Sequence, residues 1–448
     1  MRETVFVIFG ITSNLAKTKL LPALFDLYEK DVLAEGVRFV GVARKSRSRE
    51  ELKDFVCSAI FCTGNKAAEF IDKIDFLNGD LRDRGFYESL FEKLSRLTDT
   101  NRIFYLATHP SLYVDIFRNL SRIGLNKNNS GWVRLMIEKP IGMDLKSAKN
   151  LNRLLFKYFE EKQIYRIDHY LAKETIQNVL AFRFNNPIIE KTITGKNIDH
   201  VQVTVAENFG SENRNEYYDQ VGALRDVGQN HALQMVAIAT MCRPKNFDDQ
   251  GITKKRLEVL ENFKPDKDSL VLGQYDGYSY DKKDTNTFFA FKGILGHGKF
   301  NGVPVYVRGG KKLKKTVAEI VVVLKKSANF LVYRIQPNEG IIMNIFIKKP
   351  GRGMEVQPST MEFCFKNITF KIAKPYEKLV LDAIEGDQTY FNDAYEVEAE
   401  WKFIDALKAE VVVPVVYREN TWGPKESDKL IEKDGKKWIE PSDLYCKV

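Results

Sequence analysis

The first third of the chain alternates short apolar runs with segments of helical periodicity. Residues 4–9 form a continuous run rich in β-branched and aromatic side chains that ends at Gly10, as expected for a strand buried in a parallel sheet. Apolar positions at helical spacing follow over residues 15–28, and residues 37–42 are again strand-like. This succession predicts a βαβ unit whose helix start, capped by Ser13 or Asn14, can receive a pyrophosphate. Plain α/β packing without a nucleotide is the alternative reading.

Two further apolar runs, residues 102–107 and 133–137, predict more parallel strands. Each ends in a polar turn that contains proline, and ligands bind at the carboxyl ends of strands in doubly wound sheets. Lys139 stands directly before a proline, and our hypothesis is that a cis bond there directs its ammonium towards the cleft. A loop lysine in water is the alternative. A helical pattern over residues 144–158 completes a predicted first domain, residues 1–163.

The pattern changes in the remainder, residues 164–448, which we expect to form an α+β domain. Val201, Val203 and Val205 alternate with polar residues, a polar loop follows at 210–218, and a helix comes next. Short strands separated by Gly, Asn and Pro turns then predict a large, mainly antiparallel sheet. They fall at residues 288–291, 303–307, 320–324, 341–347 and 361–365.

Residues 166–174, at the predicted junction of the two domains, combine an acid, an imidazole, a phenol and an ammonium. His169, Tyr170 and Lys173 can all donate hydrogen bonds, and the predicted helix begins so that Lys173 falls on its first turn. Donors at a helix start suit a phosphate. Asp168 would repel a phosphate, so we expect it to point elsewhere and to orient an imidazole. A salt-bridged helix entrance is the alternative.

The second predicted strand is followed by basic residues at a position that determines coenzyme choice. NAD-binding units usually place an acid there for the ribose 2′-hydroxyl. This chain has instead Arg44, Lys45, Arg47 and Arg49, and a guanidinium would bind a 2′-phosphate. The pattern therefore favours NADP, with NAD as the other candidate coenzyme.

His231 is one of only five histidines and lies on the predicted helix of the second domain. Asp226 and Asn230 are near it in the sequence and could fix its tautomer. Those neighbours make His231 a candidate base, while a satisfied buried helix histidine is the alternative.

Composition narrows the function classes. Of the 448 residues 44% are hydrophobic and 29% are charged, as in ordinary globular proteins, and no apolar run is long enough to span a bilayer. The five cysteines have no Cys-x-x-Cys spacing, which predicts a reducing, cytoplasmic location and no structural metal. The net charge of +9 is dispersed along the chain, which favours small anions over nucleic acid or membrane; a solvated basic face is the alternative.

The segment 166–174 resembles the signature of the glucose-6-phosphate dehydrogenase family, with Ala172 where the family has Gly. Ser13 and Asn14 stand where the family usually has Gly and Asp, a difference that bears on coenzyme preference. Further matches follow in order along almost the whole chain, at 10–16, 138–140, 207 with 217–219, 225–226 with 229–231, 302–304, 308–311, 385–389, 396–398 and 421–424.

The resemblance implies a role for each matching residue. His231 resembles the catalytic base, and Asp168 the carboxylate that orients it. The phosphate grip is matched by His169, Tyr170 and Lys173, and the sugar-hydroxyl contacts by Glu207, Asp226 and Lys311. Lys139 resembles the lysine that reaches sugar and coenzyme. The coenzyme turn is matched by Gly10, Thr12, Ser13, Asn14 and Leu15, and the 2′-phosphate clamp by Arg44.

The resemblance also implies a Rossmann-like domain joined to a β+α domain whose large sheet forms a dimer interface. The implied assembly is a homodimer or a dimer of dimers. The implied reaction is oxidation of glucose 6-phosphate at C1 to 6-phosphoglucono-δ-lactone with hydride transfer to NADP, in the oxidative pentose phosphate pathway. Two alternatives stay open: another two-domain sugar oxidoreductase of the glucose-fructose oxidoreductase type, and a non-catalytic sugar-phosphate sensor. The former is not expected to carry the cluster from Asp168 to Lys173, and the latter is not expected to keep both His231 and Asp168.

Overall fold

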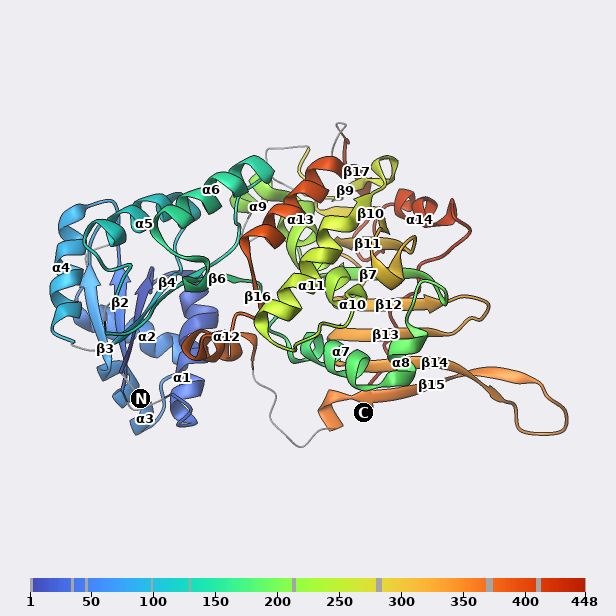
Figure 1. Ribbon diagram of the computed structural model, residues 1–448, viewed down its shortest axis with the longest axis horizontal. Coiled ribbons are helices and arrows are strands. Elements are labelled where there is room, and N and C mark those ends of the chain that lie inside the picture. The colour runs from blue at the N-terminus through green and yellow to red at the C-terminus, as the bar shows by residue number, and fades with distance from the viewer. Residues whose placement is uncertain are drawn as a thin grey trace. The chain divides into compact units, whose positions relative to one another are not determined.

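The computed structural model describes residues 3–33, 36–44, 47–97, 100–128, 130–211, 215–278, 284–367, 374–407 and 412–447. Lys45 of the predicted basic segment, and the side chain of Tyr217, lie outside the described part. The chain forms two compact units (Figure 1). Unit 1 comprises Met1–Gly142, Lys146–Ala172 and Ala373–Ala394, and unit 2 comprises Met143–Leu145, Lys173–Ile372 and Tyr395–Val448.

Unit 1 is built on a seven-stranded sheet in the order β16-β6-β5-β4-β1-β2-β3. All neighbours are parallel except β16, which runs antiparallel to β6. The predicted parallel sheet is thereby confirmed, and the apolar run of its central strand β1 is fully buried. The strands are β1 (Thr4–Phe9), β2 (Val37–Ala43), β3 (Ile74–Asn78), β4 (Asn101–Leu106), β5 (Val133–Ile137), β6 (Ile164–Ile167) and β16 (Phe391–Asn392).

Helices complete unit 1, and one of them comes from far along the chain. Helix α12 packs against α1, where Lys30 forms an ion pair of 2.6 Å with Glu377, and Arg134 on β5 donates to the carbonyls of Ala383 and Ile384 at 2.7 and 2.6 Å. The helices are η1 (Ala16–Leu20), α1 (Leu21–Glu29), α2 (Arg49–Ile60), α3 (Asn65–Asp72), α4 (Arg84–Ser95), η2 (Pro110–Leu112), α5 (Tyr113–Arg122), α6 (Leu145–Tyr158), η3 (Glu161–Gln163) and α12 (Pro375–Glu385).

Unit 2 is built on a ten-stranded sheet in the order β15-β14-β13-β12-β7-β11-β10-β9-β17, with β8 paired to β10. It is mainly antiparallel, as predicted, but β7 with β11 and β9 with β17 are parallel. The strands are β7 (Ile198–Ala206), β8 (Phe263–Pro265), β9 (Val271–Tyr275), β10 (Phe288–Leu295), β11 (Pro304–Gly310), β12 (Val317–Leu324), β13 (Phe330–Gln336), β14 (Gly340–Lys348), β15 (Val356–Cys364) and β17 (Val415–Tyr417).

Helices α7, η5 and α10 pack against this sheet (Figure 1). Elsewhere Ile439 and Tyr445 of the carboxyl-terminal segment pack on Val321, Val332 and Ile342 of three neighbouring strands. The helices of unit 2 are α7 (Glu174–Asn185), α8 (Pro187–Thr192), α9 (Asn215–Ala223), η5 (Leu224–Ala232), α10 (Leu233–Thr240), α11 (Asp249–Asn262), η6 (Lys267–Ser269), η7 (Gly298–Phe300), η8 (Phe365–Asn367), α13 (Ala394–Leu407) and α14 (Lys425–Glu432).

The structure differs from the sequence prediction at three points near the candidate site. The segment predicted as a polar loop at 210–218 already contains the start of α9, because Asn215 begins that helix. Lys173 caps α7 from outside and does not lie on its first turn. Strand β6 lies beyond residue 163, where the sequence places the end of the first domain, and it pairs with β5 as part of the sheet of unit 1.

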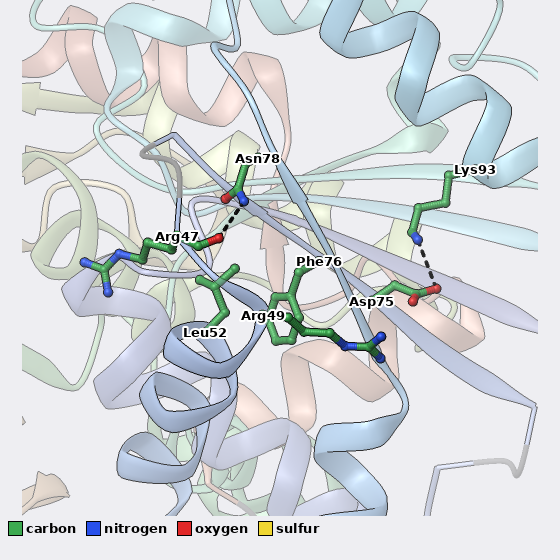
Figure 2. Close-up of a pocket in the computed structure, with 7 residues that line it drawn as sticks. All are labelled: Arg47, Arg49, Leu52, Asp75, Phe76, Asn78 and Lys93. Atoms are coloured by element: carbon green, nitrogen blue, oxygen red, sulfur yellow. Dashed lines mark hydrogen bonds and ion pairs between the residues drawn. The ribbon is translucent and has the colours of Figure 1, made fainter.

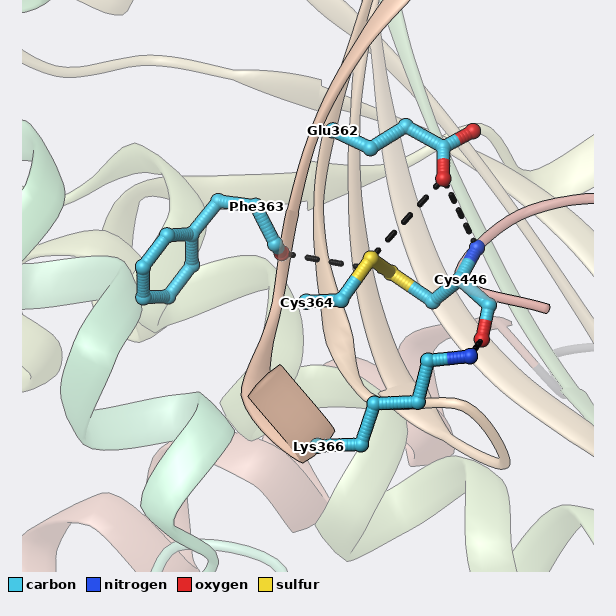
Figure 3. Close-up of a disulfide and its surroundings, with 5 residues drawn as sticks. All are labelled: Glu362, Phe363, Cys364, Lys366 and Cys446. Carbon is cyan, nitrogen blue, oxygen red and sulfur yellow. Dashed lines mark hydrogen bonds between the residues drawn. A yellow bond between two sulfur atoms is a disulfide. The ribbon is translucent and has the colours of Figure 1, made fainter. Parts of the chain in front are cut away.

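Cys364 at the end of β15 forms a disulfide with Cys446, 82 positions further along the chain (Figure 3). Cysteine spacing gave no sign of this pair, because only the fold brings the two residues together. Cys57, Cys62 and Cys242 are free thiols. Among the described residues, no helix combines the length and the apolar character needed to cross a lipid bilayer.

Candidate active site

A tight turn follows β1 in unit 1, where the sequence predicts the coenzyme turn. Gly10 has a φ of +84°, and a Cβ there would lie 2.6 Å from the carbonyl oxygen of Ala107, so a larger residue would strain the turn. The Ser13 hydroxyl accepts a hydrogen bond from the N–H of Ala16 at 3.1 Å, so of the two predicted capping residues Ser13 supplies the oxygen. The first N–H groups of a helix attract anions. The other predicted contacts of this turn are Thr12, Asn14 and Leu15.

Arg44 is exposed directly after β2, and a cavity of about 180 Å³ lies near the next residues of the chain (Figure 2). Its wall includes the basic residues Arg47, Arg49 and Lys93 and one carboxylate, Asp75. Lys93 lies 3.4 Å from Asp75, which leaves an excess of positive charge from the two arginines. The donor set at this end of β2 and β3 therefore fits the 2′-phosphate of NADP better than an uncharged ribose hydroxyl.

Lys139 follows a buried carboxylate at the end of β5. The Glu138 carboxylate accepts hydrogen bonds from the phenols of Tyr105 at 2.5 Å and Tyr376 at 3.1 Å, and its carbonyl accepts one from Tyr113 at 3.1 Å. Burial raises the pKa of Glu138; the phenols and Lys139 oppose the rise, and Asp168 adds to it. The peptide bond from Lys139 to the following proline is cis, as hypothesised. The backbone that carries Lys139 is thus anchored by three phenols.

Asp168, His169 and Tyr170 follow β6 in unit 1. Asp168 is only 2% exposed, and its Oδ1 accepts the N–H of Tyr170 at 2.8 Å. The rings of His169 and Tyr170 contact each other edge to face, with centroids 5.2 Å apart. The negative charge of Asp168 adds to the rise in the pKa of both Glu138 and Tyr376. Asp168, the predicted orienting acid, therefore lies in the same part of unit 1 as the residues that anchor Lys139.

In unit 2, the predicted phosphate-binding lysine has a partner that sequence reasoning missed. The ammonium of Lys173 donates to the side-chain oxygen of Gln336 at the end of β13. Burial raises the pKa of Glu339, and the charge of Lys173 opposes that rise. Gln336 is a neutral amide more than 160 positions away, so no charge pattern could have indicated it.

Glu207 and Lys311 lie at the carboxyl ends of two parallel neighbours, β7 and β11. Their side chains form an ion pair, and the ammonium of Lys311 lies 5.3 Å from the ring centre of Tyr218. Burial raises the pKa of Tyr218 well above its usual value, and the charges of Asp226 and Glu207 add to the rise. Of the three predicted sugar contacts, the structure therefore pairs Glu207 with Lys311 beside Tyr218, and the charge of Asp226 acts on the same phenol.

His231 is 2% exposed and lies on η5, a π-helical segment between α9 and α10. Such segments are frequent at functional sites, but the sequence gave no sign of it. Glu400 on α13 accepts hydrogen bonds from the side-chain amide of Gln229 on η5 at 2.9 Å and from that of Gln234 on α10 at 2.8 Å. These bonds on either side of His231 restrict the backbone that carries the imidazole. Glu400 is a second positioning residue that sequence reasoning missed.

Comparison with known proteins covers the whole chain. Residues 7–178 match the family model described as glucose-6-phosphate dehydrogenase, NAD binding domain, and residues 180–439 match that of the C-terminal domain. The glucose-6-phosphate 1-dehydrogenase of Aggregatibacter actinomycetemcomitans is 37% identical, with 98% of each chain covered.

Solved structures agree. The fold matches glucose-6-phosphate dehydrogenase in complex with its substrate glucose 6-phosphate, with a TM-score of 0.90, 32% identity and coverage of 98% and 99% of the two chains. The enzyme from Mycobacterium avium gives a TM-score of 0.89 at 29% identity, with the same coverage. These matches confirm the predicted fold, and they confirm that the protein is an NADP-linked oxidoreductase. This chain belongs to the glucose-6-phosphate dehydrogenase family.

Proposed function

We propose that this protein oxidises the C1 hydroxyl of glucose 6-phosphate to 6-phosphoglucono-δ-lactone, with NADP as coenzyme, as the entry reaction of the oxidative pentose phosphate pathway. The observation that carries the proposal is the ion pair of Glu207 and Lys311 beside buried Tyr218, on which the charge of Asp226 also acts. It offers both acceptors and a cation to sugar hydroxyls in a chain of this family. Membership of this family also argues against the alternative that the chain is a sugar oxidoreductase of the glucose-fructose oxidoreductase type.

His231 serves as the base. Oxidation removes the proton of the C1 hydroxyl as a hydride leaves C1, and a neutral imidazole can accept that proton near pH 7. When bound, NADP supplies the hydride acceptor. We assign to Asp168 the role of holding the imidazole in the right tautomer and stabilising the imidazolium. Glu400, through Gln229 and Gln234, keeps the backbone of His231 in place.

The remaining residues bind and align. His169, Tyr170 and Lys173 hold the phosphate as hydrogen-bond donors, and Gln336 holds the ammonium of Lys173 in position. The turn from Gly10 to Leu15 receives the pyrophosphate, and Arg44 holds the 2′-phosphate, supported by Arg47 and Arg49. Lys139 contacts both sugar and coenzyme. Fixing the reacting atoms in this way is itself a large part of catalysis.

One assay tests substrate and coenzyme together. Nicotinamide reduction is followed with glucose 6-phosphate, glucose and galactose 6-phosphate, each with NADP and with NAD. The expected result is the highest kcat/KM for glucose 6-phosphate with NADP. Equal rates with glucose would contradict the phosphate grip, and equal rates with NAD would contradict the 2′-phosphate clamp.

We further propose that two copies of this chain associate through β14 and β15. Strand β15 is the last strand of its sheet, and the hairpin extends beyond the other strands (Figure 1). Its exposed apolar side chains are Phe346, Ile347, Met354, Val356, Met361 and Phe363. By the strand register, Ile347, Met361 and Phe363 share one face of the hairpin, and Phe346 and Val356 share the other. Exposed apolar surface of this kind favours an interface. Sedimentation velocity should show a dimer that Met361→Lys weakens. Val416→Lys, at exposed β17 on the opposite edge, is the control and should leave the dimer intact. A monomeric wild type would contradict the proposal.

A cytoplasmic location belongs to the same proposal. It is supported by the free thiols Cys57, Cys62 and Cys242, since such thiols persist in reducing compartments. Cell fractionation with an antibody against the native protein tests it, and recovery outside the cytoplasm would contradict it.

A further inference from the structure

The disulfide between Cys364 and Cys446 lies beside a carboxylate that belongs to no part of the sugar site (Figure 3). Glu362 and Cys364 are two positions apart on β15, so their side chains lie on the same face of the strand. Cys446 comes from the carboxyl-terminal segment. The Glu362 Oε2 lies 3.8 Å from the Cys364 Sγ and accepts the N–H of Cys446 at 2.9 Å. One oxygen and both sulfurs lie within 4.8 Å of one another. Three potential metal ligands therefore converge at one point.

The ligand types fit a thiophilic cation once the sulfurs are reduced. Two thiolates and a carboxylate form a donor set that Zn²⁺ prefers, and tetrahedral zinc needs one further ligand. With Zn–S bonds of about 2.3 Å, a tetrahedral site places sulfur and oxygen ligands about 3.6 Å apart. The carboxylate of Glu362 already lies near that distance from Cys364. Glu362 is exposed while both cysteines are buried, so water can supply the fourth ligand.

Charge balance favours the same cation. Two thiolates and one carboxylate around Zn²⁺ carry a net charge of −1. Lys366, two positions after Cys364, donates its ammonium to the carbonyl of Cys446 and compensates that charge locally. A cationic neighbour also favours the thiolate form that a metal requires.

The link holds the chain end on the sheet. The guanidinium of Arg334 donates to the carbonyl of Ser442 at 3.1 Å and lies 5.5 Å from the ring centre of Tyr445, and Lys315 pairs with Asp443 at 2.6 Å. Cys446 of this segment is bonded to Cys364 on the outermost strand. A reducing environment would remove the covalent link, and a metal held by the same two sulfurs would replace it.

We propose that the reduced protein binds one Zn²⁺ through Cys364, Cys446 and Glu362, and that this site replaces the disulfide as the link between β15 and the chain end. A dithiol reduces the disulfide: two electrons pass to the Cys364 and Cys446 sulfurs, both become thiols, and the dithiol becomes its own disulfide. Zn²⁺ then displaces one proton from each thiol. This inference is independent of the sugar site and of its chemistry.

The test uses the full chain, oxidised or reduced with dithiothreitol that is then removed by gel filtration under nitrogen. Titration with Co²⁺ should give the charge-transfer and d–d absorption of a tetrahedral thiolate site in the reduced protein alone, and Zn²⁺ should abolish it at one equivalent per chain. The double variant Cys364→Ser/Cys446→Ser should lose the signal, and Glu362→Gln should weaken the affinity by about tenfold or more.

The matched control is the free pair Cys57 and Cys62, whose thiols hydrogen-bond to each other. Cys57→Ser/Cys62→Ser should keep the cobalt signal. Zn²⁺ should also raise the Tm of the reduced wild type, and of this control, but not that of Cys364→Ser/Cys446→Ser. The proposal is overturned if the reduced wild type binds no more cobalt than Cys364→Ser/Cys446→Ser, if the oxidised protein binds equally, or if the signal depends on Cys57 and Cys62.

Discussion

Arg256 on α11 and Glu396 on α13 form a doubly hydrogen-bonded ion pair in the interior of unit 2. The guanidinium Nε and Nη2 donate to the two carboxylate oxygens at 2.7 and 2.9 Å, and both side chains are fully buried. Helix α13 also carries Glu400, which accepts hydrogen bonds from Gln229 on η5 and Gln234 on α10, on either side of His231. The ion pair thus fixes the helix that contacts the backbone around the proposed base.

Glu396→Gln should destabilise unit 2 by about 3–5 kcal/mol, because it leaves the Arg256 charge buried without a counter-charge. Urea unfolding followed by tryptophan fluorescence measures this loss. The matched control is the partly exposed pair of Lys255 and Glu258, 2.5 Å apart on the same helix, where Glu258→Gln should cost less than about 1 kcal/mol. Equal losses in the two variants would show that the Arg256 pair contributes no more than a surface pair.

The sequence predicts β1, β2, β4 and β5, whose residues are mainly apolar, but it does not predict β6, which contains a buried charge. Strand β6 contains Arg166, which is buried and paired with Glu161 at 2.6 Å, so its pattern reads as polar. Helix α12 returns to unit 1 through bonds from Arg134 to carbonyls about 250 positions away and through apolar packing of Leu379 and Val380, and periodicity cannot show either set of partners.

In the candidate site, too, some residues could be predicted from the sequence and others could not. Charged and titratable residues such as Lys311 and His231 could be named because they match motifs of the family that the sequence resembles. The residues that position them could not. Gln336 and Glu400 act through contacts between distant segments, and neither belongs to a local pattern that points to a function.

His231→Asn should lower kcat with glucose 6-phosphate by a factor on the order of 10² or more, since no base then accepts the C1 proton. KM for the sugar phosphate should change little, because the phosphate grip is untouched. His297→Asn is the matched control, because His297 is also a buried histidine of unit 2 and its Nε2 lies 3.2 Å from the carbonyl of Thr240. It should keep near-normal turnover. Normal turnover of His231→Asn would remove His231 from its proposed role.

Arg44→Ala should raise KM for NADP by about tenfold or more and leave KM for NAD nearly unchanged, because only NADP carries the phosphate that the guanidinium contacts. Steady-state kinetics with both coenzymes at saturating glucose 6-phosphate provide the comparison. The control is Arg38→Ala on β2, where the guanidinium lies 3.5 Å from Glu3, and it should affect neither coenzyme. A similar loss for both coenzymes in Arg44→Ala would refute the clamp.

Asp382 on α12 should make the stability of unit 1 depend on pH. Burial raises the pKa of its carboxyl from 3.8 to about 6, although Lys378 lies 2.8 Å away. Since the folded state holds this proton more tightly than the unfolded state, the free energy of unfolding should fall as the pH rises from about 4 to about 6 and then level off. Asp382→Asn should remove this part of the fall, whereas exposed Asp54→Asn should keep it. Urea unfolding across that range measures the difference, and parallel curves for wild type and Asp382→Asn would contradict the assignment.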